Sequence, residues 1–337
     1  MTLREELEAL EHIQLDAKAA FANETKGRFR PEEPKAEDVR TAYQRDTDKI
    51  VHSKAFRRLM HKTQVFLQPE GDHYRTRMTH TLEVARIART VAKALNLNED
   101  LAEAAAMGHD LGHTPFGHAG EVALSEAMGE PFRHNEQSLR VVDILENGGE
   151  GLNLTYEVRM GILGHTGPFV PETMEGQIVR WADRVAYVNH DIDDAVRAGI
   201  LQASDIPRFV LKTLGQTHSA RINTLVCDMI TTTREAGKVS FSPQVEKALN
   251  DLRTFMFERV YRNPVAKAEE AKAKDMLKRL YEYYYTHPEA IPVDFQPQMS
   301  LEGMERTVCD YIAGMTDNYA VDKYTELFIP TGWNIRG

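Results

Sequence analysis

The sequence predicts an all-α protein, and three features of the chain lead to this prediction. Apolar residues between Leu82 and Leu95 (Leu82, Ala85, Ala88, Val91, Ala92, Leu95) recur at spacings of three and four, as on one face of an amphipathic helix. No series of short segments alternates apolar and polar residues in the way that strands do. The glycines never form the patterns GxGxxG or GxxxxGK(S/T), so no Rossmann or P-loop phosphate site is predicted. If the chain handles phosphates, it needs a metal ion or basic side chains to do so.

Caps and breakers place the predicted helices along the chain. Residues 1–37 are interpreted as a peripheral helix and a linker, because Pro31 and Pro34 interrupt them. Asn98 is a predicted N-cap of a helix that runs to about His109 and stops at the breaker cluster 112–115. Three further helices are predicted at 118–128, stopped by Gly129, at 135–146, and at 174–198, closed by Gly199. Helical spacing then continues from about 200 to 326.

Bulk composition excludes several functional classes. Lys and Arg total 41 and Asp and Glu total 51, a net charge of −10, which disfavours broad nonspecific nucleic-acid binding. Cys227 and Cys309 form neither a CxxC pair nor a disulfide framework, so a reducing, cytoplasmic location is expected. The N-terminal residues contain no apolar stretch typical of a signal peptide, and no apolar run is long enough for a membrane span.

Histidines concentrate where the chemistry is expected. Four of them fall between residues 109 and 134, with one more a helix earlier: His109, His113, His118, His134 and His80. An imidazole and a carboxylate at His109-Asp110 are expected side by side at an exposed helix end, since neither belongs in an apolar core without a partner. Two imidazoles with two carboxylates form a mixed set that suits Mn, Fe, Co, Ni or Mg and leaves positions free for water and substrate. Taken alone, a His-Asp pair would indicate surface residues in a turn.

A polar stripe follows on the long helix predicted at 174–198. Asp183, Tyr187 and Asp191 are spaced by four and therefore lie along one face. The stripe could supply one metal ligand and two contacts to a sugar. A solvated acidic face with an ordinary core tyrosine is the alternative interpretation.

The combination of His80, His109-Asp110 and Asp183 resembles the metal-binding pattern of the HD phosphohydrolases. Longer segments resemble the deoxyguanosine triphosphate triphosphohydrolase family within that superfamily. They read, in order, HSKAFRRL from 52 with KTQV from 62, RTRMTHTLEV from 75, HDLGHTPFGHAGE from 109, ADRVAYVNHDIDDA from 182 and DYIAGMTD from 310. The likeness spans about 45 to 325, and the five segments in order are far more specific than the bare pattern. It implies an HD-domain helical bundle with additional C-terminal helices, divided into an N-terminal helix and linker (1–45), a catalytic core (46–200) and a C-terminal region packed on the core (201–337).

The resemblance also implies roles for individual residues. One divalent metal ion would be bound by His80, His109, Asp110 and Asp183. His118 corresponds to a catalytic histidine, and Glu121 lies one turn on, where it can orient that imidazole. Phosphate-contacting roles fall on His113, His134 and Arg77, and deoxyribose-contacting roles on Tyr187 and Asp191. A helix cap or a loop hydrogen bond is the alternative for His113 and His134.

One segment departs from the family pattern. Some relatives carry a glutamine that contacts the nucleoside after the equivalent of Arg58-Leu59, whereas this chain has Met60-His61. Arg58 and His61 are therefore predicted substrate contacts whose selectivity the resemblance does not fix. Taken singly, Arg57, Arg58, Lys62 and Arg75 are more simply interpreted as solvated charges.

The reaction that the resemblance implies is hydrolysis of a dNTP, dGTP or several dNTPs, to deoxynucleoside and tripolyphosphate. Metal-activated water would attack the α-phosphorus, and His118 would move a proton either to the departing 5′-oxygen or from the water. Alternatives are another HD reaction, such as a 5′-nucleotidase or phosphodiesterase, and a dNTP-sensing or nucleic-acid-binding module with little turnover. The expected partners are the dNTP substrate, further copies of the chain in a homo-oligomer, and single-stranded nucleic acid as a candidate effector, with no membrane.

Overall fold

The computed structural model describes residues 2–32, 38–64, 75–262 and 264–330, without the side chains of 264–268. Val65, at the end of the first family-like segment, lies outside these ranges. Within the described residues the regular structure is helical, apart from isolated bridges that join Arg28 to Thr155 and Thr63 to Thr76. The predicted all-α class is therefore confirmed. No helix in these ranges is both long and apolar enough to cross a membrane.

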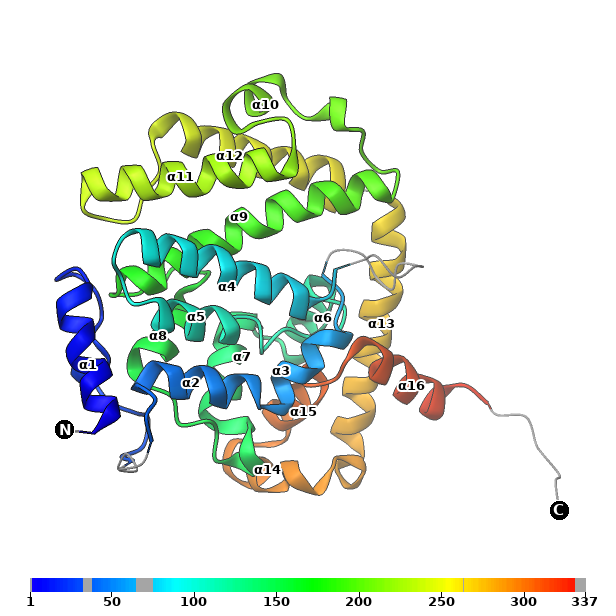
Figure 1. Cartoon of the computed structure of the whole chain (residues 1–337). Coiled ribbons are helices and arrows are strands. Elements are labelled where there is room, and N and C mark those ends of the chain that lie inside the picture. The colour runs from blue at the N-terminus through cyan, green and yellow to red at the C-terminus, as the bar shows by residue number, and fades with distance from the viewer. Residues whose placement is uncertain (1, 33–37, 65–74, 263, 331–337) are drawn as a thin grey trace, which may run out of the picture.

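The α-helices follow one another along the whole chain (Figure 1). They are α1 (Leu3–Gln14), α2 (Ala42–Val51), α3 (Lys54–Arg58), α4 (Arg77–Ala94), α5 (Glu99–Gly108), α6 (His118–Met128), α7 (His134–Arg140), α8 (Tyr156–Gly164), α9 (Met174–Arg197), α10 (Arg208–Leu214), α11 (His218–Ala236), α12 (Pro243–Met256), α13 (Pro264–Thr286), α14 (Gln296–Glu302), α15 (Met304–Ala313) and α16 (Asp317–Phe328). Short 3₁₀ and π turns connect them, including π turns at Val141–Leu145 and Phe257–Tyr261.

The central helix is α5, which packs against α2, α4, α8 and α9. Its buried face is built mainly from alanines, so the surrounding helices can approach it closely. Gly108 ends the helix where Ile162 of α8 comes nearest, and a Cβ at Gly108 would fall 2.5 Å from the Cδ1 atom of Ile162. This close packing holds the C-terminal end of α5, and with it His109-Asp110, in the middle of the bundle.

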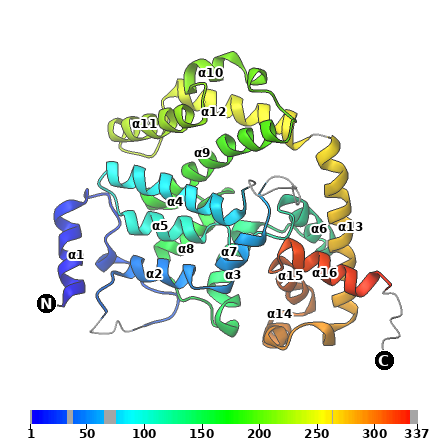
Figure 2. The same cartoon turned by 45° about the vertical axis from the view of Figure 1, so that its right-hand side comes forward.

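The residues after 200 contribute to two separate hydrophobic clusters. Helices α10, α11 and α12 pack together above α9 and join the core that contains α4 and α5 (Figure 1). Helices α13, α15 and α16 instead pack with α6 around a second core that contains Phe116, Leu277 and Ile312 (Figure 2). The residues after 200 therefore pack on the earlier helices in two separate places.

Several predicted helix boundaries agree with the structure. The side chain of Asn98 accepts hydrogen bonds from the backbone N–H groups of Asp100 and Leu101, as an N-cap does. Helix α6 has the predicted bounds, and Gly129 ends it with a φ of 74° in the left-handed region that favours glycine. The helix predicted at 135–146 is α-helical only to Arg140 and continues as a π turn.

One prediction about the buried face of α4 was wrong. Leu82 is 44% exposed, whereas Arg77, His80 and Thr81 are buried on the same helix. The apolar periodicity could not indicate this, because the N-terminal half of α4 turns polar side chains towards the interior, where Arg77 contacts Asp110 and His80 contacts Asp183.

Candidate active site

Four side chains from three helices converge at the predicted metal site. His80 comes from α4, His109 and Asp110 from the end of α5, and Asp183 from the middle of α9. The Nε2 atom of His80 lies 3.0 Å from Oδ1 of Asp183, and Nε2 of His109 lies 3.4 Å from Oδ1 of Asp110 and 3.9 Å from Oδ1 of Asp183. Ligand atoms of His80, His109 and Asp110 all lie within 4.8 Å of one another. The four predicted ligands therefore face one small volume.

The orientation of His109 fits a metal ligand. Its Nδ1–H donates to the carbonyl of Ala106 at 2.6 Å, which leaves Nε2 with a free lone pair. That Nε2 atom is buried and has no hydrogen-bond partner among the described residues. A buried acceptor without a partner is costly, and a divalent cation would satisfy it.

The sequence-based expectation of an exposed His-Asp pair was wrong. His109 is fully buried and Asp110 is 3% exposed. They tolerate burial because each has partners there: Asp110 accepts a hydrogen bond from Nη1 of Arg77 at 2.9 Å, and His109 bonds to Ala106. The pair therefore lies among polar partners in the interior of the bundle and not in an exposed turn.

Both carboxylates of this cluster are held ionised. Burial raises the pKa of Asp183, but the hydrogen bond from His80 and the neighbouring imidazoles outweigh burial and lower it to about 2. Burial also opposes ionisation of Asp110, but the electrostatic effect of the neighbouring imidazoles and of the Arg77 guanidinium outweighs burial, so its pKa lies well below the ordinary value. Two carboxylates and two imidazoles form an oxygen and nitrogen donor set suited to a divalent cation with open coordination positions.

A chain of hydrogen bonds lies beside the four predicted metal ligands, which are called the metal cluster below. Nδ1 of His118 lies 2.9 Å from Oε2 of Glu121, and the other carboxylate oxygen, Oε1, lies 2.5 Å from Nδ1 of His134. Nε2 of His134 in turn lies 3.1 Å from Nε2 of His165. Burial raises the pKa of Glu121, but its bonds to His118 and His134 bring it far below the ordinary value, so it stays a carboxylate between two imidazoles.

His118 and His134 differ in exposure. The His118 side chain is 79% exposed and the His134 side chain 14% exposed. With Nδ1 engaged by Glu121, Nε2 of His118 is available to a substrate. His113 stacks on His134 with ring centroids 4.0 Å apart, and its Nε2 lies 3.4 Å from Asp110.

The loop between α5 and α6 approaches Arg77 closely. Gly117 has a φ of +56°, and a Cβ there would lie 2.8 Å from a terminal nitrogen of Arg77. The preceding residue, Phe116, also has a positive φ of 61°, which is a strained conformation for a bulky side chain. The backbone N–H of Phe116 donates to the Asp317 carboxylate at 3.0 Å, and Thr63 binds the same carboxylate. Asp317, from the C-terminal family-like segment, thus holds the loop that shapes this side of the site.

The stripe on α9 faces a residue from far along the chain. Oδ2 of Asp191 accepts a short hydrogen bond from the hydroxyl of Tyr261, and Tyr187 lies one turn away on α9. Burial raises the pKa of Asp191 to about 7, and it raises the pKa of Tyr187 to about 12. Asp191 is buried, whereas Asp183 and Tyr187 are half-buried and Tyr187 packs against the hydrophobic core. The stripe is therefore not the solvated acidic face of the alternative interpretation, but its tyrosine does pack as a core residue.

Arg58 and His61 lie apart from this cluster. Arg58 lines a separate pocket next to Gly314, and the side chain of His61 is exposed. Lys62, interpreted as a solvated charge, is only 2% exposed, and that interpretation was wrong. Its ammonium group donates to the carbonyl of His113, which is 51 residues away in the sequence. It also donates to the carbonyl of Ala313 at 2.9 Å, and that residue is 251 positions away. Burial lowers the pKa of Lys62 to about 7.

Two residues at the site were missed by the sequence reasoning. His165 lies against His134, and Tyr261 donates a hydrogen bond to Asp191. His165 could have been found, because it ends an apolar helix just before Gly167 as His109 does before Gly112. No local signal marks Tyr261, which is 70 residues from its partner Asp191.

The chain is similar to known proteins over nearly its whole length. Residues 77–188 match the family model of the HD domain, and residues 239–326 match that of the phosphohydrolase-associated domain. A deoxyguanosinetriphosphate triphosphohydrolase-like protein of Caldanaerobacter subterraneus subsp. tengcongensis is 53% identical over 99% of this chain and 98% of its own length. Proteins with the same description from Desulfatibacillum aliphaticivorans and Clostridium perfringens are each 47% identical, over 98% of this chain and 99% and 98% of their own lengths.

Proposed function

Because the chain belongs to the family of deoxyguanosinetriphosphate triphosphohydrolase-like proteins of the HD class, we propose that it hydrolyses deoxynucleoside triphosphates, dGTP or several dNTPs, to deoxynucleoside and tripolyphosphate. The observation that carries the proposal is the convergence of His80, His109, Asp110 and Asp183 beside a second row of polar side chains. A metal site alone would suit many reactions. The flanking imidazoles and the polar stripe on α9 suit, in addition, a polyphosphate group that is joined to a sugar.

One divalent cation, Mn, Mg, Fe, Co or Ni, would be held by these four residues. When bound, such a cation lowers the pKa of water and stabilises charge on phosphoryl oxygens. The buried, partnerless Nε2 of His109 and the ionised Asp110 and Asp183 are the features of the chain that suit it.

His118 is the proposed proton carrier. Its ring is exposed towards solvent and anchored through Nδ1 to Glu121, so Nε2 can give a proton to the departing 5′-oxygen or take one from the attacking water. Glu121 remains a carboxylate and can therefore hold the ring in place through Nδ1.

Phosphate contacts are proposed for Arg77, His113 and His134. Arg77 is buried beside Asp110, and His113 and His134 stack on each other near the same carboxylate. Together they place donors on the side of the metal cluster that faces Glu121, where a polyphosphate chain would carry its negative charge.

The sugar is proposed to lie along α9. Tyr187 lies one turn and Asp191 two turns from Asp183, so a deoxyribose joined to a phosphate at the metal cluster would meet them. Tyr261 closes the far side through its hydrogen bond to Asp191. The bulk of the phenol at Tyr187 leaves little room for a 2′-hydroxyl, which favours dNTPs over NTPs.

Anion-exchange separation of the products formed from each dNTP tests this proposal. Intact tripolyphosphate with free deoxynucleoside supports it. Orthophosphate would indicate a nucleotidase, dNMP with pyrophosphate a different cleaved bond, and the absence of products a sensing module. We also propose a cytoplasmic location, which rests on the cysteine usage, and a closed homo-oligomer with single-stranded nucleic acid as a candidate effector, which rests on the family resemblance.

A further inference from the structure

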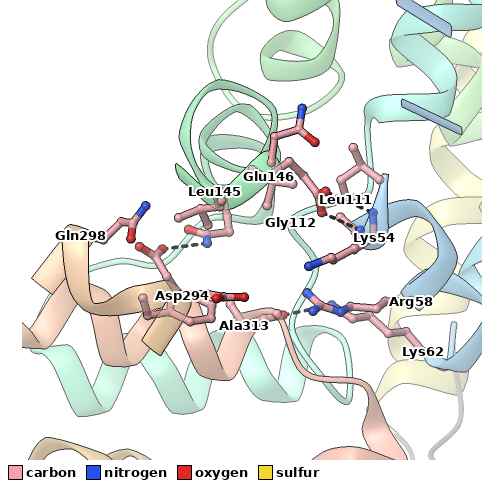
Figure 3. A pocket seen from close by; sticks show the side chains of 18 residues that line it. Lys54, Arg58, Lys62, Leu111, Gly112, Leu145, Glu146, Asp294, Gln298 and Ala313 are labelled. Atoms are coloured by element: carbon pink, nitrogen blue, oxygen red, sulfur yellow. Dashed lines mark hydrogen bonds between the residues drawn. The ribbon is translucent and has the colours of Figure 1, made fainter. Parts of the chain in front are cut away.

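A pocket distinct from the metal cluster lies between α3, α7 and the C-terminal helices α14 and α15 (Figure 3). It is a small pocket with a cavity volume of about 90 Å³. Apolar side chains from Ala55, Leu111, Val141 and Leu145 line one part, and charged and amide side chains line the rest. The proposed reaction uses none of this pocket.

Two cations on α3 extend into the pocket without an anionic partner. Figure 3 shows Lys54 and Arg58 pointing from α3 towards the side formed by α14. Within the described ranges, neither side chain has a carboxylate at ion-pair distance. An Arg fork and a Lys ammonium side by side suit a doubly charged phosphate group.

Two of the carboxylates that line the pocket are already engaged. Glu146 accepts hydrogen bonds from the backbone N–H groups of Lys54 and Ala55 at 3.1 and 2.7 Å. Asp310 is 1% exposed and receives hydrogen bonds from Gln137 and Arg140. Neither Glu146 nor Asp310 forms an ion pair with Lys54 or Arg58 among the described residues, and Asp294 is the lining carboxylate without a cation partner there.

A buried polar atom in the α14 wall also lacks a partner. Gln298 is only 5% exposed, and its Oε1 makes no hydrogen bond within the part of the chain that the structure describes. An orphaned buried acceptor costs free energy unless something donates to it. Beside it, Asp294 offers a second acceptor and Phe295 an aromatic side chain.

We propose that this pocket binds a phosphate monoester whose organic part carries hydrogen-bond donors. The phosphate lies against Lys54 and Arg58, and N–H or O–H groups of the organic part donate to Gln298 and Asp294. Nucleoside 5′-monophosphates and sugar phosphates share this chemistry. The two acceptors distinguish such an ester from inorganic phosphate, which would engage the cations alone.

The pocket shares a wall with the active site but none of its proposed ligands. Gly112, which lines the pocket, donates from its N–H to Ser138 Oγ at 2.9 Å and lies two residues from Asp110. Lys62 lines the pocket too and binds the His113 carbonyl. Binding at the pocket can therefore be measured separately from metal binding.

Isothermal titration of the full chain with adenosine 5′-monophosphate, glucose 6-phosphate and inorganic phosphate tests the proposal. We expect one of the two esters to bind more tightly than inorganic phosphate, and the ester that binds identifies the source. Lys54→Glu and Gln298→Met should each weaken that binding by about 10- to 100-fold, the effect of losing one hydrogen bond in a charged site. Lys212→Glu, an equal charge change at an exposed position on α10, should leave it unchanged.

Three results would overturn the proposal. They are no ester binding at ligand concentrations of about 1 mM, ester binding no tighter than that of inorganic phosphate, and ester binding that Lys54→Glu leaves intact. Ester binding that is lost in Asp183→Ala but kept in Lys54→Glu would assign the ligand to the metal cluster instead. Since Lys54 is exposed, its variant is expected to fold, and the result does not depend on the buried Gln298 variant.

Discussion

The Nε2 atoms of His134 and His165 lie 3.1 Å apart, so one ring must donate to the other. His165 donates from Nδ1 to the Ile162 carbonyl at 2.7 Å, and burial lowers its pKa to about 3, so its Nε2 is an acceptor. His134 must then donate from Nε2 while its Nδ1 faces the Glu121 carboxylate. Although burial opposes protonation of His134, that carboxylate outweighs it and raises the pKa. His134 is therefore held as an imidazolium, the form that attracts phosphate.

Replacing His165 tests this relationship. His165→Phe removes the acceptor, and turnover should fall by about 10- to 100-fold, the effect of one hydrogen bond to a charged group. His165→Gln restores an acceptor and should recover part of the loss. Steady-state rates with parallel metal analysis are the measurement. Equal losses in both variants, or a loss of bound metal, would contradict the role assigned to His165.

His118→Ala should lower the turnover number by about 10²- to 10⁴-fold, the range for loss of a general acid or base. Metal content should not change, because His118 is not among the four ligands and bonds to Glu121 instead. Elemental analysis of the purified variant provides the control. If metal and activity disappear together, His118 is a ligand and the proton-transfer role is wrong.

Asp183→Ala should abolish both metal binding and turnover, because Asp183 is the proposed ligand from α9 and its carboxylate lies beside His80 and His109. Asp193→Ala, on the same helix, is the matched control. Its carboxylate is partly exposed and comes no nearer than 3.9 Å to His218 and Arg221. Full metal occupancy in Asp183→Ala would remove Asp183 from the ligand set, and a metal loss in Asp193→Ala would show that the effect is not specific to the cluster.

Lys62 should give the protein a distinct dependence of stability on pH. The unfolded chain keeps the ammonium group protonated up to its ordinary pKa of 10.5, whereas burial lowers the folded pKa to about 7. Between these values the unfolded state binds more protons, so the free energy of unfolding contributed by Lys62 rises with pH. Denaturant unfolding across this window should show a smaller rise in Lys62→Met than in the original chain. Parallel curves for the two proteins would mean that Lys62 titrates normally.

The fold was largely predictable because its signals are local. Asn98 and Gly129 mark a helix start and a helix end through their own backbone and side-chain chemistry, and the structure has both. The exposure of Leu82 could not be predicted in this way. The exposure of Leu82 depends on which polar residues of α4 have partners across the bundle, and the spacing of apolar residues does not indicate those partners.

The site was predictable where residues repeat a known pattern and not where distant segments meet. His80, His109, Asp110 and Asp183 were identified from the family-like segments and lie together in the structure. The burial of Lys62 depends on the carbonyl of Ala313, 251 residues away, and the position of Tyr261 depends on a π turn that ends α12. Contacts of this kind arise only from the packing of the C-terminal helices on the core.

Hydrolysis in ¹⁸O-labelled water tests most directly which bond this site cleaves. Asp183 would place the metal at the scissile phosphorus, with the sugar along Tyr187 and Asp191, so water should attack the α-phosphorus and the 5′-oxygen should leave with the nucleoside. Mass spectrometry should then find one ¹⁸O atom in the tripolyphosphate and none in the deoxynucleoside. Label in the nucleoside hydroxyl, or formation of dNMP and pyrophosphate, would contradict the account even if the metal ligands are correct.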